Sequence, residues 1–171
     1  FKVSLNTVSH ALKVPRKAGI VLVSKKGIVV RDLEKFITLW ATKRNLKKDI
    51  MYSAPANLAA YEIEKLMPGG IIWGAYSAYR FLYPEEPLPA SYDKIYVYAN
   101  ESKLGELKKR FPTGLGKKTV ESKVHIIRAD AFMEKYGRIA PVAQILADLW
   151  NLPEWYAAEY YRALKNKIVQ S

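Results

Sequence analysis

The sequence contains no cysteine and only two histidines, His10 and His125. Without cysteine the chain cannot form disulfide bonds, thiolate zinc sites or cysteine nucleophiles. Two histidines that lie far apart in the sequence argue against a histidine-based metal site, so a metal would have to depend on carboxylates. We therefore expect neither a metal nor any other cofactor.

Long apolar segments are also lacking, since no run of eighteen apolar residues occurs and the first residues show no signal-peptide pattern. Half of the 171 residues are nevertheless apolar, and twelve tyrosines and four tryptophans are among them. This composition predicts a folded chain with room for a small module and a domain of ordinary size. We expect a cytoplasmic protein that does not enter a membrane.

The positive charge is unevenly distributed along the chain, whose formal net charge is +12. Residues 1–49 contain twelve Lys or Arg and three Asp or Glu, and residues 101–128 contain eight and three. Positive charge concentrated at one end is typical of a surface that meets phosphate groups, whereas evenly spread lysine would indicate only solubility. The distribution therefore favours nucleic acid as a partner of the N-terminal part.

The first 32 residues predict the second half of a winged helix-turn-helix, a fold that binds double-stranded DNA. Ser4 can cap a helix over residues 5–18, and Gly19 can end it. Two apolar runs, 20–23 and 28–31, then flank a short basic segment, which is typical of a hairpin. The order of helix, glycine and basic hairpin predicts a recognition helix followed by its wing.

The helical repeat divides the first helix into an apolar and a polar side. Leu5, Val8, Ala11 and Leu12 recur at steps of three and four residues and form one stripe. The polar residues point away from this stripe, so that the first of them can reach base edges and the later cations can contact phosphates. The predicted DNA-contacting residues are Asn6, Thr7, Ser9, His10, Lys13, Arg16, Lys17, Lys25 and Lys26.

Two features complicate this interpretation. Pro15 lacks the amide that a helix uses, so we expect the helix to bend or end early and to offer only residues 4–14 to a groove. The alternative for the whole segment is a small amphipathic helix and a solvated hairpin whose lysines serve only solubility, with His10 an exposed histidine of no assigned role.

The chain begins at Phe1, within the turn that would precede a recognition helix. We expect that the one or two preceding helices of such a fold are missing, either because the polypeptide is a fragment or because a partner chain completes the fold. Val3, Val8 and Leu12 would otherwise form an exposed apolar patch.

The rest of the chain predicts a hinge at 42–49 and an α/β domain with a mixed sheet and two C-terminal helices. The fold class is thus α+β, with a partial winged helix-turn-helix over residues 1–48 and the α/β domain over 49–171. Strands are expected at 50–53, 71–73, 94–99 and 123–128, helices at 33–43, 56–66, 75–82, 102–111, 141–150 and 152–169, and a loop of glycine and lysine at 112–118.

An enzyme is the first alternative, a metal-dependent nucleotidyltransferase or nuclease that uses Asp93 and the Gly69–Ser77 region. Small residues in that region let a backbone approach a ligand, but the lysine and spacing of a phosphate loop are absent, and we favour close packing of a helix on a strand as their explanation. Asp93 has no second carboxylate nearby in the sequence, although magnesium needs several hard oxygens. We therefore assign no catalytic residue.

A protein-interaction module is the second alternative, because aromatic residues are frequent near the end of the chain. Their spacing also suits the buried side of a helix, and we expect them to belong to the core. The residues concerned are Trp150, Trp155, Tyr156, Tyr160 and Tyr161.

Five segments together resemble the AbiEi family of transcriptional regulators, which are described as antitoxins of type IV toxin-antitoxin systems in abortive infection. They are the N-terminal half winged helix, Arg-Asp-Leu-Glu-Lys-Phe-Ile-Thr-Leu-Trp at 31–40, Gly-Ala-Tyr-Ser-Ala at 74–78, Ile-Tyr-Val-Tyr at 95–98 and Pro-Val-Ala-Gln-Ile-Leu-Ala-Asp-Leu-Trp at 141–150. The resemblance covers nearly the whole chain through loose motifs, and the missing start and Pro15 depart from it.

The resemblance implies a winged helix that represses its own operon and a C-terminal domain needed for the antitoxin role. Domains of this kind look like degenerate relatives of nucleotidyltransferases, which would explain a glycine pair and a single Asp93 without a metal site. Its implied partners are double-stranded DNA and, in function, a nucleotidyltransferase-type toxin, with or without direct contact. Because dimers read most operators, a homodimer would suit this role, although no heptad pattern specifies one.

Overall fold

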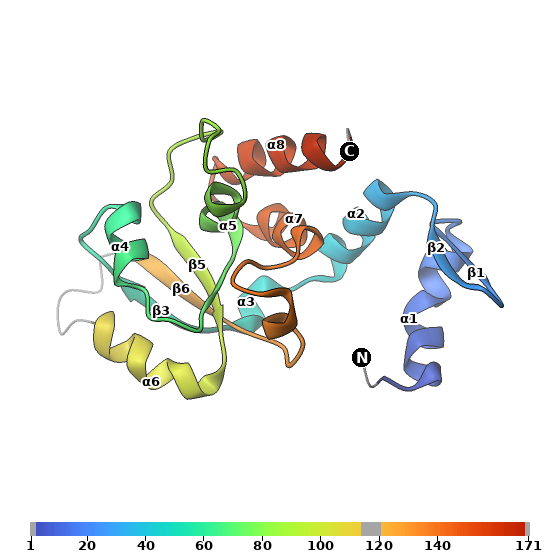
Figure 1. Cartoon of the computed structure of the whole chain (residues 1–171), viewed down its shortest axis with the longest axis horizontal. Helices are drawn as coiled ribbons and strands as arrows, with labels where there is room; N and C mark the ends of the chain where they lie inside the picture. Colours follow the sequence, from blue (N-terminus) through green and yellow to red (C-terminus); the bar gives the residue numbers. More distant parts are fainter. Residues whose placement is uncertain (1–2, 114–120, 170–171) are drawn as a thin grey trace. The chain divides into compact units, whose positions relative to one another are not determined.

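The computed structural model describes residues 3–113 and 121–169, and over these ranges it is a mixed α+β structure with eight α-helices and two β-sheets (Figure 1). The α+β class and the mixed sheet predicted from the sequence are confirmed. The chain divides into two compact units, one ending at Arg44 and the other beginning at Asn45, whereas the sequence pattern had placed the boundary at residue 48. Part of the loop expected at 112–118 lies outside the described residues.

The N-terminal unit consists of α1 (Leu5–Lys17), β1 (Val21–Ser24), β2 (Gly27–Val30) and α2 (Leu33–Lys43). Side-chain caps start both helices, because Ser4 Oγ accepts from the Thr7 amide at 3.1 Å and Asp32 Oδ1 accepts from the Lys35 amide at 2.9 Å. Gly19 follows α1 with φ +70°, a conformation in which a side chain would be strained.

Pro15 does not end the first helix, contrary to expectation. The helix continues to Lys17, and the Ala18 amide still donates to the Val14 carbonyl at 3.0 Å. Pro15 lies within the last turn, so its missing amide removes one hydrogen bond near the helix end while its ring is buried. The polar side of α1 is therefore one turn longer than the sequence pattern indicated.

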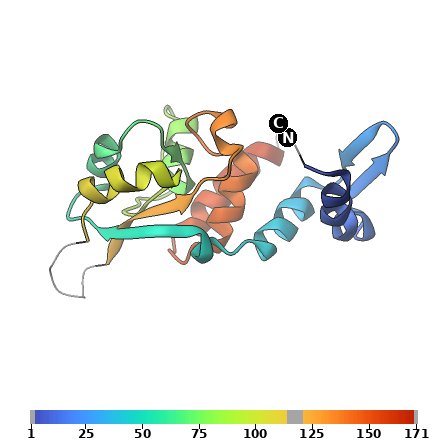
Figure 2. The ribbon, with the colours of Figure 1, turned by 90° about the horizontal axis from the view of Figure 1, so that it is seen from below.

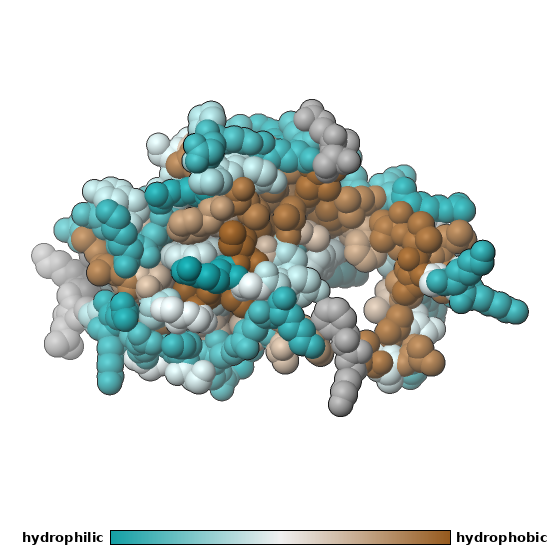
Figure 3. All heavy atoms as spheres, in the orientation of Figure 1, coloured by the Kyte–Doolittle hydropathy of each residue, from teal (hydrophilic) through white to brown (hydrophobic). Residues whose placement is uncertain are grey.

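The core of the N-terminal unit is small. Apart from Pro15, its buried apolar residues within the described part are Ile20, Val21, Ile37 and Ala41. The apolar stripe predicted on α1 is only partly covered, since Leu5 is 89 % exposed. All four residues of β2 are exposed as well. Figure 3, which colours apolar residues brown, shows such side chains on the surface of this unit.

The second unit is built around a four-stranded sheet in the order β3-β6-β5-β4. The strands β3 (Ile50–Pro55) and β6 (Ser122–Arg128) are antiparallel, β6 and β5 (Ile95–Ala99) are parallel, and β5 and β4 (Ile72–Trp73) are antiparallel. All five residues of β5 are buried, so both faces of the sheet are covered at its centre.

Helices cover the two faces of this sheet. In Figure 1, α5 (Ala75–Leu82), α7 (Val142–Asn151) and α8 (Ala157–Val169) lie together, and α6 (Glu101–Arg110) lies across the sheet from them. The remaining elements are α3 (Leu46–Asp49), α4 (Ala60–Leu66) and a 3-10 helix at Met133–Tyr136. Within the described ranges, no helix is both long and apolar enough to cross a membrane.

Two predicted helices begin later than the sequence pattern indicated. The helix expected from residue 56 begins at Ala60, where the Glu62 carboxylate accepts from the Ala59 amide at 2.8 Å. The helix expected from residue 152 begins at Ala157, because the preceding segment turns and places the Glu154 side chain in the interior. This second difference creates the pocket described below.

Candidate functional site

All nine side chains predicted to contact DNA are exposed in the structure. Seven of them lie along α1, and Lys25 and Lys26 form the two-residue turn between Ser24 and Gly27 at the tip of the hairpin. The Ser24 hydroxyl accepts from the Lys26 amide at 3.2 Å, and Gly27 has φ +134°. The turn therefore has a defined backbone and leaves both lysine side chains at the surface.

The hairpin is attached to the C-terminal end of α1 by backbone hydrogen bonds. The Ile20 amide donates to the Pro15 carbonyl at 2.9 Å, and the Arg31 amide donates to the Ile20 carbonyl at 2.8 Å. Figure 2 shows the hairpin extending away from the helix as a separate arm. Lys17 thus lies near the base of the arm, about 15 Å along the helix from Thr7 at a rise of about 1.5 Å per residue.

The predicted base-reading residues near the start of α1 are not all equally available. Thr7 belongs to the helix cap, since its hydroxyl lies 2.9 Å from the Ser4 hydroxyl and its amide donates to the same oxygen. Asn6, beside Thr7 in the first turn, and Ser9 and His10 on the next turn are exposed. A DNA contact by Thr7 would therefore compete with the capping interaction.

The N-terminal unit contains more basic than acidic residues. Residues 1–44 contain ten Lys or Arg and two Asp or Glu. One carboxylate, that of Asp32, pairs with Lys35 at 3.0 Å, and the backbone hydrogen bond from Lys35 lowers its pKa. Among the described residues, no carboxylate forms an ion pair with the five basic residues of the predicted interface: Lys13, Arg16, Lys17, Lys25 and Lys26.

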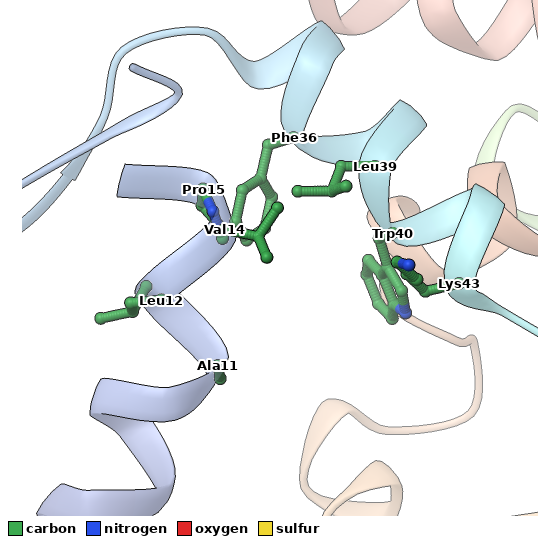
Figure 4. Close-up of a pocket in the computed structure, with 8 residues that line it drawn as sticks. All are labelled: Ala11, Leu12, Val14, Pro15, Phe36, Leu39, Trp40 and Lys43. Carbon is green, nitrogen blue, oxygen red and sulfur yellow. The ribbon is translucent and has the colours of Figure 1, made fainter. Parts of the chain in front are cut away.

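An apolar groove of about 280 Å³ separates α1 from α2 within the same unit (Figure 4). In Figure 4, Val14 of α1 and Phe36 of α2 point toward each other. The groove is lined by Ala11, Leu12, Val14, Pro15, Phe36, Leu39, Trp40 and Lys43. It lies on the apolar side of α1, and the predicted contact residues do not line it.

The second unit contains a polar pocket of about 530 Å³. Its deepest carboxylate is Glu154, whose side chain is 5 % exposed and accepts from the Tyr76 hydroxyl at 2.9 Å and the Tyr96 hydroxyl at 3.0 Å. Lys94 Nζ lies 3.0 Å from the same carboxylate and also contacts Glu121. The lining residues are Asp93, Lys94, Glu121, Pro153, Glu154, Trp155 and Tyr156.

These interactions hold both partners of the buried pair in their charged forms. Burial alone would raise the pKa of Glu154, but hydrogen bonds from Lys94 and Tyr76 outweigh it and the pKa lies below its usual value. Burial alone would lower the pKa of Lys94, but hydrogen bonds to Glu121 and Glu154 outweigh it and the pKa is raised. Burial, followed by the Glu154 charge, raises the pKa of Tyr76 and Tyr96, which therefore stay protonated donors.

Asp93, the residue of the enzyme alternative, lies at the edge of this pocket. Its carboxylate accepts from the Tyr156 hydroxyl at 2.8 Å and lies 3.8 Å from Lys123 Nζ. Over residues 3–113 and 121–169, no group of three or more His, Asp or Glu side chains is arranged to hold a metal ion. Catalysis through Asp93 remains an untested alternative.

The Gly69–Ser77 region does not line the pocket, and its glycine at position 74 has a packing role. A Cβ on Gly74 would lie 3.2 Å from the Tyr96 carbonyl oxygen and 3.2 Å from the Tyr98 ring. The next residue, Ala75, has φ +45° and is buried. The small residues thus permit close approach of β4, β5 and the start of α5, as the packing interpretation predicts.

The C-terminal aromatic residues fall into two groups, although all were expected in the core. Tyr156 and Tyr160 are buried and pack edge-on against the Tyr76 ring at 4.8 and 5.1 Å between centroids. Trp150 and Trp155 are instead 50 % and 74 % exposed. The expectation was wrong for Trp155 because the turn before α8 shifts it out of the helical register that was assumed. It was also wrong for Trp150, which lies near the end of α7 with its ring 5.5 Å from that of the half-buried Tyr161.

Sequence reasoning missed Glu154 and the pairing of Ser53 with His125. The register of β3 and β6 places these two residues opposite each other, and Ser53 Oγ lies 2.9 Å from His125 Nδ1. Seventy-two positions separate them in the chain, so no local spacing could reveal the contact. For Glu154, the proline immediately before it was the available signal of a turn.

No family model, curated protein or solved structure matches this chain.

Proposed function

We propose that the N-terminal unit is a partial winged helix-turn-helix that binds double-stranded DNA, and that the protein is a transcriptional autorepressor of the antitoxin type. The observation that carries the proposal is the exposure of all nine predicted contact residues on α1 and the hairpin tip. The excess of basic residues in the same unit and the absence of carboxylate partners for the interface cations, among the described residues, support it further.

In this proposal, the two parts of the interface have different tasks. Asn6, Ser9, His10 and Lys13 on α1 contact base edges in the major groove, with Thr7 at the helix start. Arg16 and Lys17 at the end of α1 and Lys25 and Lys26 on the wing contact phosphates and set the orientation of the duplex. The extension of α1 beyond Pro15 supports the inclusion of Arg16 and Lys17, because both lie on a continuous helix.

The antitoxin role of the second unit is inferred from the resemblance to the AbiEi family alone. In that role the unit acts in functional opposition to a nucleotidyltransferase-type toxin. Expression of the protein together with the product of a neighbouring gene would test it, since rescue of growth should require residues 45–171.

DNA binding is tested by fluorescence anisotropy with a duplex from the upstream region of the gene, over a series of salt concentrations. Each lost phosphate contact reduces the slope of log affinity against log salt by about 0.9, so Lys25→Ala with Lys26→Ala should reduce it by about 2 and weaken all duplexes alike. Asn6→Ala or His10→Ala should instead reduce the preference for one sequence, at about 1–3 kcal/mol per lost base contact.

A matched control removes two lysines from the second unit, Lys108→Ala with Lys109→Ala on α6, where both side chains are exposed. This variant has the same net charge as the wing variant. If the two double variants lose affinity equally, the effect is one of overall charge and the wing has no special part in binding. Unchanged binding in the wing and α1 variants would contradict the proposal.

A further inference from the structure

Trp155 differs from the other aromatic residues around Glu154 because it is largely exposed. It follows Glu154 in the turn before α8 and forms part of the pocket wall, with its ring 5.5 Å from that of Tyr156. Its side chain does not serve the tyrosine core, and an indole at 74 % exposure has a large apolar surface in water. Large rigid aromatic side chains of this kind often anchor partner side chains.

The turn that carries Trp155 is held in place from both sides. The preceding residue, Glu154, accepts hydrogen bonds from Tyr76, Tyr96 and Lys94, and the following residue, Tyr156, donates to Asp93. The indole is therefore presented on an ordered backbone. A preorganised surface loses little conformational entropy when it binds a partner.

The charge of this pocket contrasts with that of the protein as a whole. The chain has a net charge of +12, but three carboxylates and one ammonium group line the pocket: Asp93, Glu121 and Glu154 with Lys94. The Lys94 ammonium contacts Glu121 and Glu154, and Lys123 lies 3.8 Å from Asp93 at the edge. The accessible carboxylates are those of Glu121 and Asp93, which are 73 % and 52 % exposed.

We propose that this pocket binds an arginine side chain from a segment of a partner protein. The guanidinium group stacks on the Trp155 indole and donates hydrogen bonds to the carboxylates of Asp93 and Glu121. Arginine suits this combination because its planar cation both stacks on aromatic faces and forms paired hydrogen bonds with carboxylates. Phosphate groups do not suit it, because the accessible charges are negative and Lys94 already has two carboxylate partners.

The test uses the whole chain and capped Gly-Gly-Arg-Gly-Gly, a peptide whose single charge is the guanidinium group. The indole N–H signal of Trp155, assigned by its loss in Trp155→Phe, is followed by NMR during titration. The matched peptide carries citrulline, which has the same shape without the charge. The arginine peptide should shift the Trp155 signal saturably and bind about tenfold more tightly than the citrulline peptide.

Variants separate the pocket from general effects. Asp93→Asn and Glu121→Gln should each weaken arginine binding severalfold, and Trp155→Ala should abolish it in calorimetry, while Trp150→Phe and Glu159→Gln outside the pocket should leave it unchanged. A response that does not saturate, equal binding of the two peptides, or equal losses in the pocket and control variants would overturn the proposal. Tighter binding of a nucleoside monophosphate than of the arginine peptide would also overturn it. None of these results would affect the proposal that the N-terminal unit binds DNA.

Discussion

The two units of this protein bury their residues in opposite ways. In the N-terminal unit, five residues make up the buried set within the described part, and β2 and most of α1 are exposed. In the second unit, β5 is buried along its whole length and α7 contributes four apolar residues and Asp148 to the interior. Most residues of the first unit are therefore exposed to solvent, whereas the second unit has an extensive buried core.

Tyrosine shows the same contrast, because residues 1–44 contain none and residues 45–171 contain all twelve. The ring of Tyr76 contacts four other tyrosine rings, those of Tyr92, Tyr96, Tyr156 and Tyr160. Small cores provide little stability, so a ligand of the N-terminal unit should raise that unit's stability more noticeably than it would raise that of the second. The stability of the two units should therefore respond differently to pH and to truncation of side chains.

Alkaline pH should give the largest difference between the units. Burial raises the pKa of Tyr76, Tyr92, Tyr96, Tyr156 and Tyr160 above the ordinary value of tyrosine. Groups with a raised pKa in the folded state stabilise it fully below their unfolded pKa, and the contribution is lost as pH rises. Above about pH 10, each such tyrosine should lower the free energy of unfolding of the second unit by about 1.4 kcal/mol per pH unit.

Urea denaturation between pH 9 and 12, followed by tyrosine circular dichroism, measures this loss. Tyr76→Phe removes one of the titrating groups and should make the decline less steep by about 1.4 kcal/mol per pH unit. The carbon-bound proton NMR signals of residues 3–44 should keep their folded positions where those of the second unit lose theirs. Simultaneous loss of both sets would show that the units unfold together.

Truncation of matched isoleucines should give the next largest difference. Ile145 on α7 is 0 % exposed, so Ile145→Ala should lower the free energy of unfolding by about 2–5 kcal/mol through lost burial and a cavity. Ile28 on β2 is 48 % exposed, and Ile28→Ala should change it by less than about 0.5 kcal/mol. Urea denaturation midpoints measure the effect of Ile145→Ala, and limited proteolysis of the hairpin measures the effect of Ile28→Ala. A large loss of stability from Ile28→Ala would contradict this contrast between the two units.

Replacement of a buried carboxylate in the second unit should have a smaller effect. Glu154→Gln removes the charge that Lys94 faces and keeps only one acceptor oxygen for Tyr76 and Tyr96, which donate to different oxygens of the carboxylate, and it should cost about 2 kcal/mol near neutral pH. Glu159→Gln is the control, since its pair with Arg162 is exposed and should contribute less than about 0.5 kcal/mol.

The pH dependence of this variant gives a second measurement. Glu154 has a lowered pKa in the folded state, so its contribution is present above the unfolded pKa and is lost as pH falls through the folded pKa. The difference in unfolding free energy between the wild type and Glu154→Gln should therefore shrink as the solution is acidified below about pH 4. A difference that stays constant with pH would show that packing, rather than charge, explains the loss.

Local patterns predicted most of the elements correctly where the deciding contacts are also local. The Ser4 and Asp32 caps act over three residues, and the hairpin turn spans Ser24 to Gly27. The predicted interface on α1 and the hairpin lies at the surface for the same reason, because helical phase and turn position determine which side chains face outward. Whether these side chains bind DNA remains a prediction.

Local patterns failed where a distant residue supplied the deciding contact. The helix expected from residue 152 begins at Ala157, since Glu154 turns inward to Tyr76 and Tyr96, which lie 78 and 58 positions away. The expected helix would have placed Trp155 on a buried side, and Trp155 was therefore assigned to the core. The pairing of Ser53 with His125 depends on the register of two strands that are also far apart in the chain.

The amino-acid sequence by itself determined the α+β class, the helix caps, the basic hairpin tip and the segregation of charge and tyrosine between the two units. These properties follow from composition and from forces between residues a few positions apart. Only the tertiary structure decided that Glu154 is buried, that Trp155 is exposed and that three carboxylates share a pocket. The reason is that a carboxylate leaves water only when enough donors converge on it, and here the donors come from segments that meet through folding.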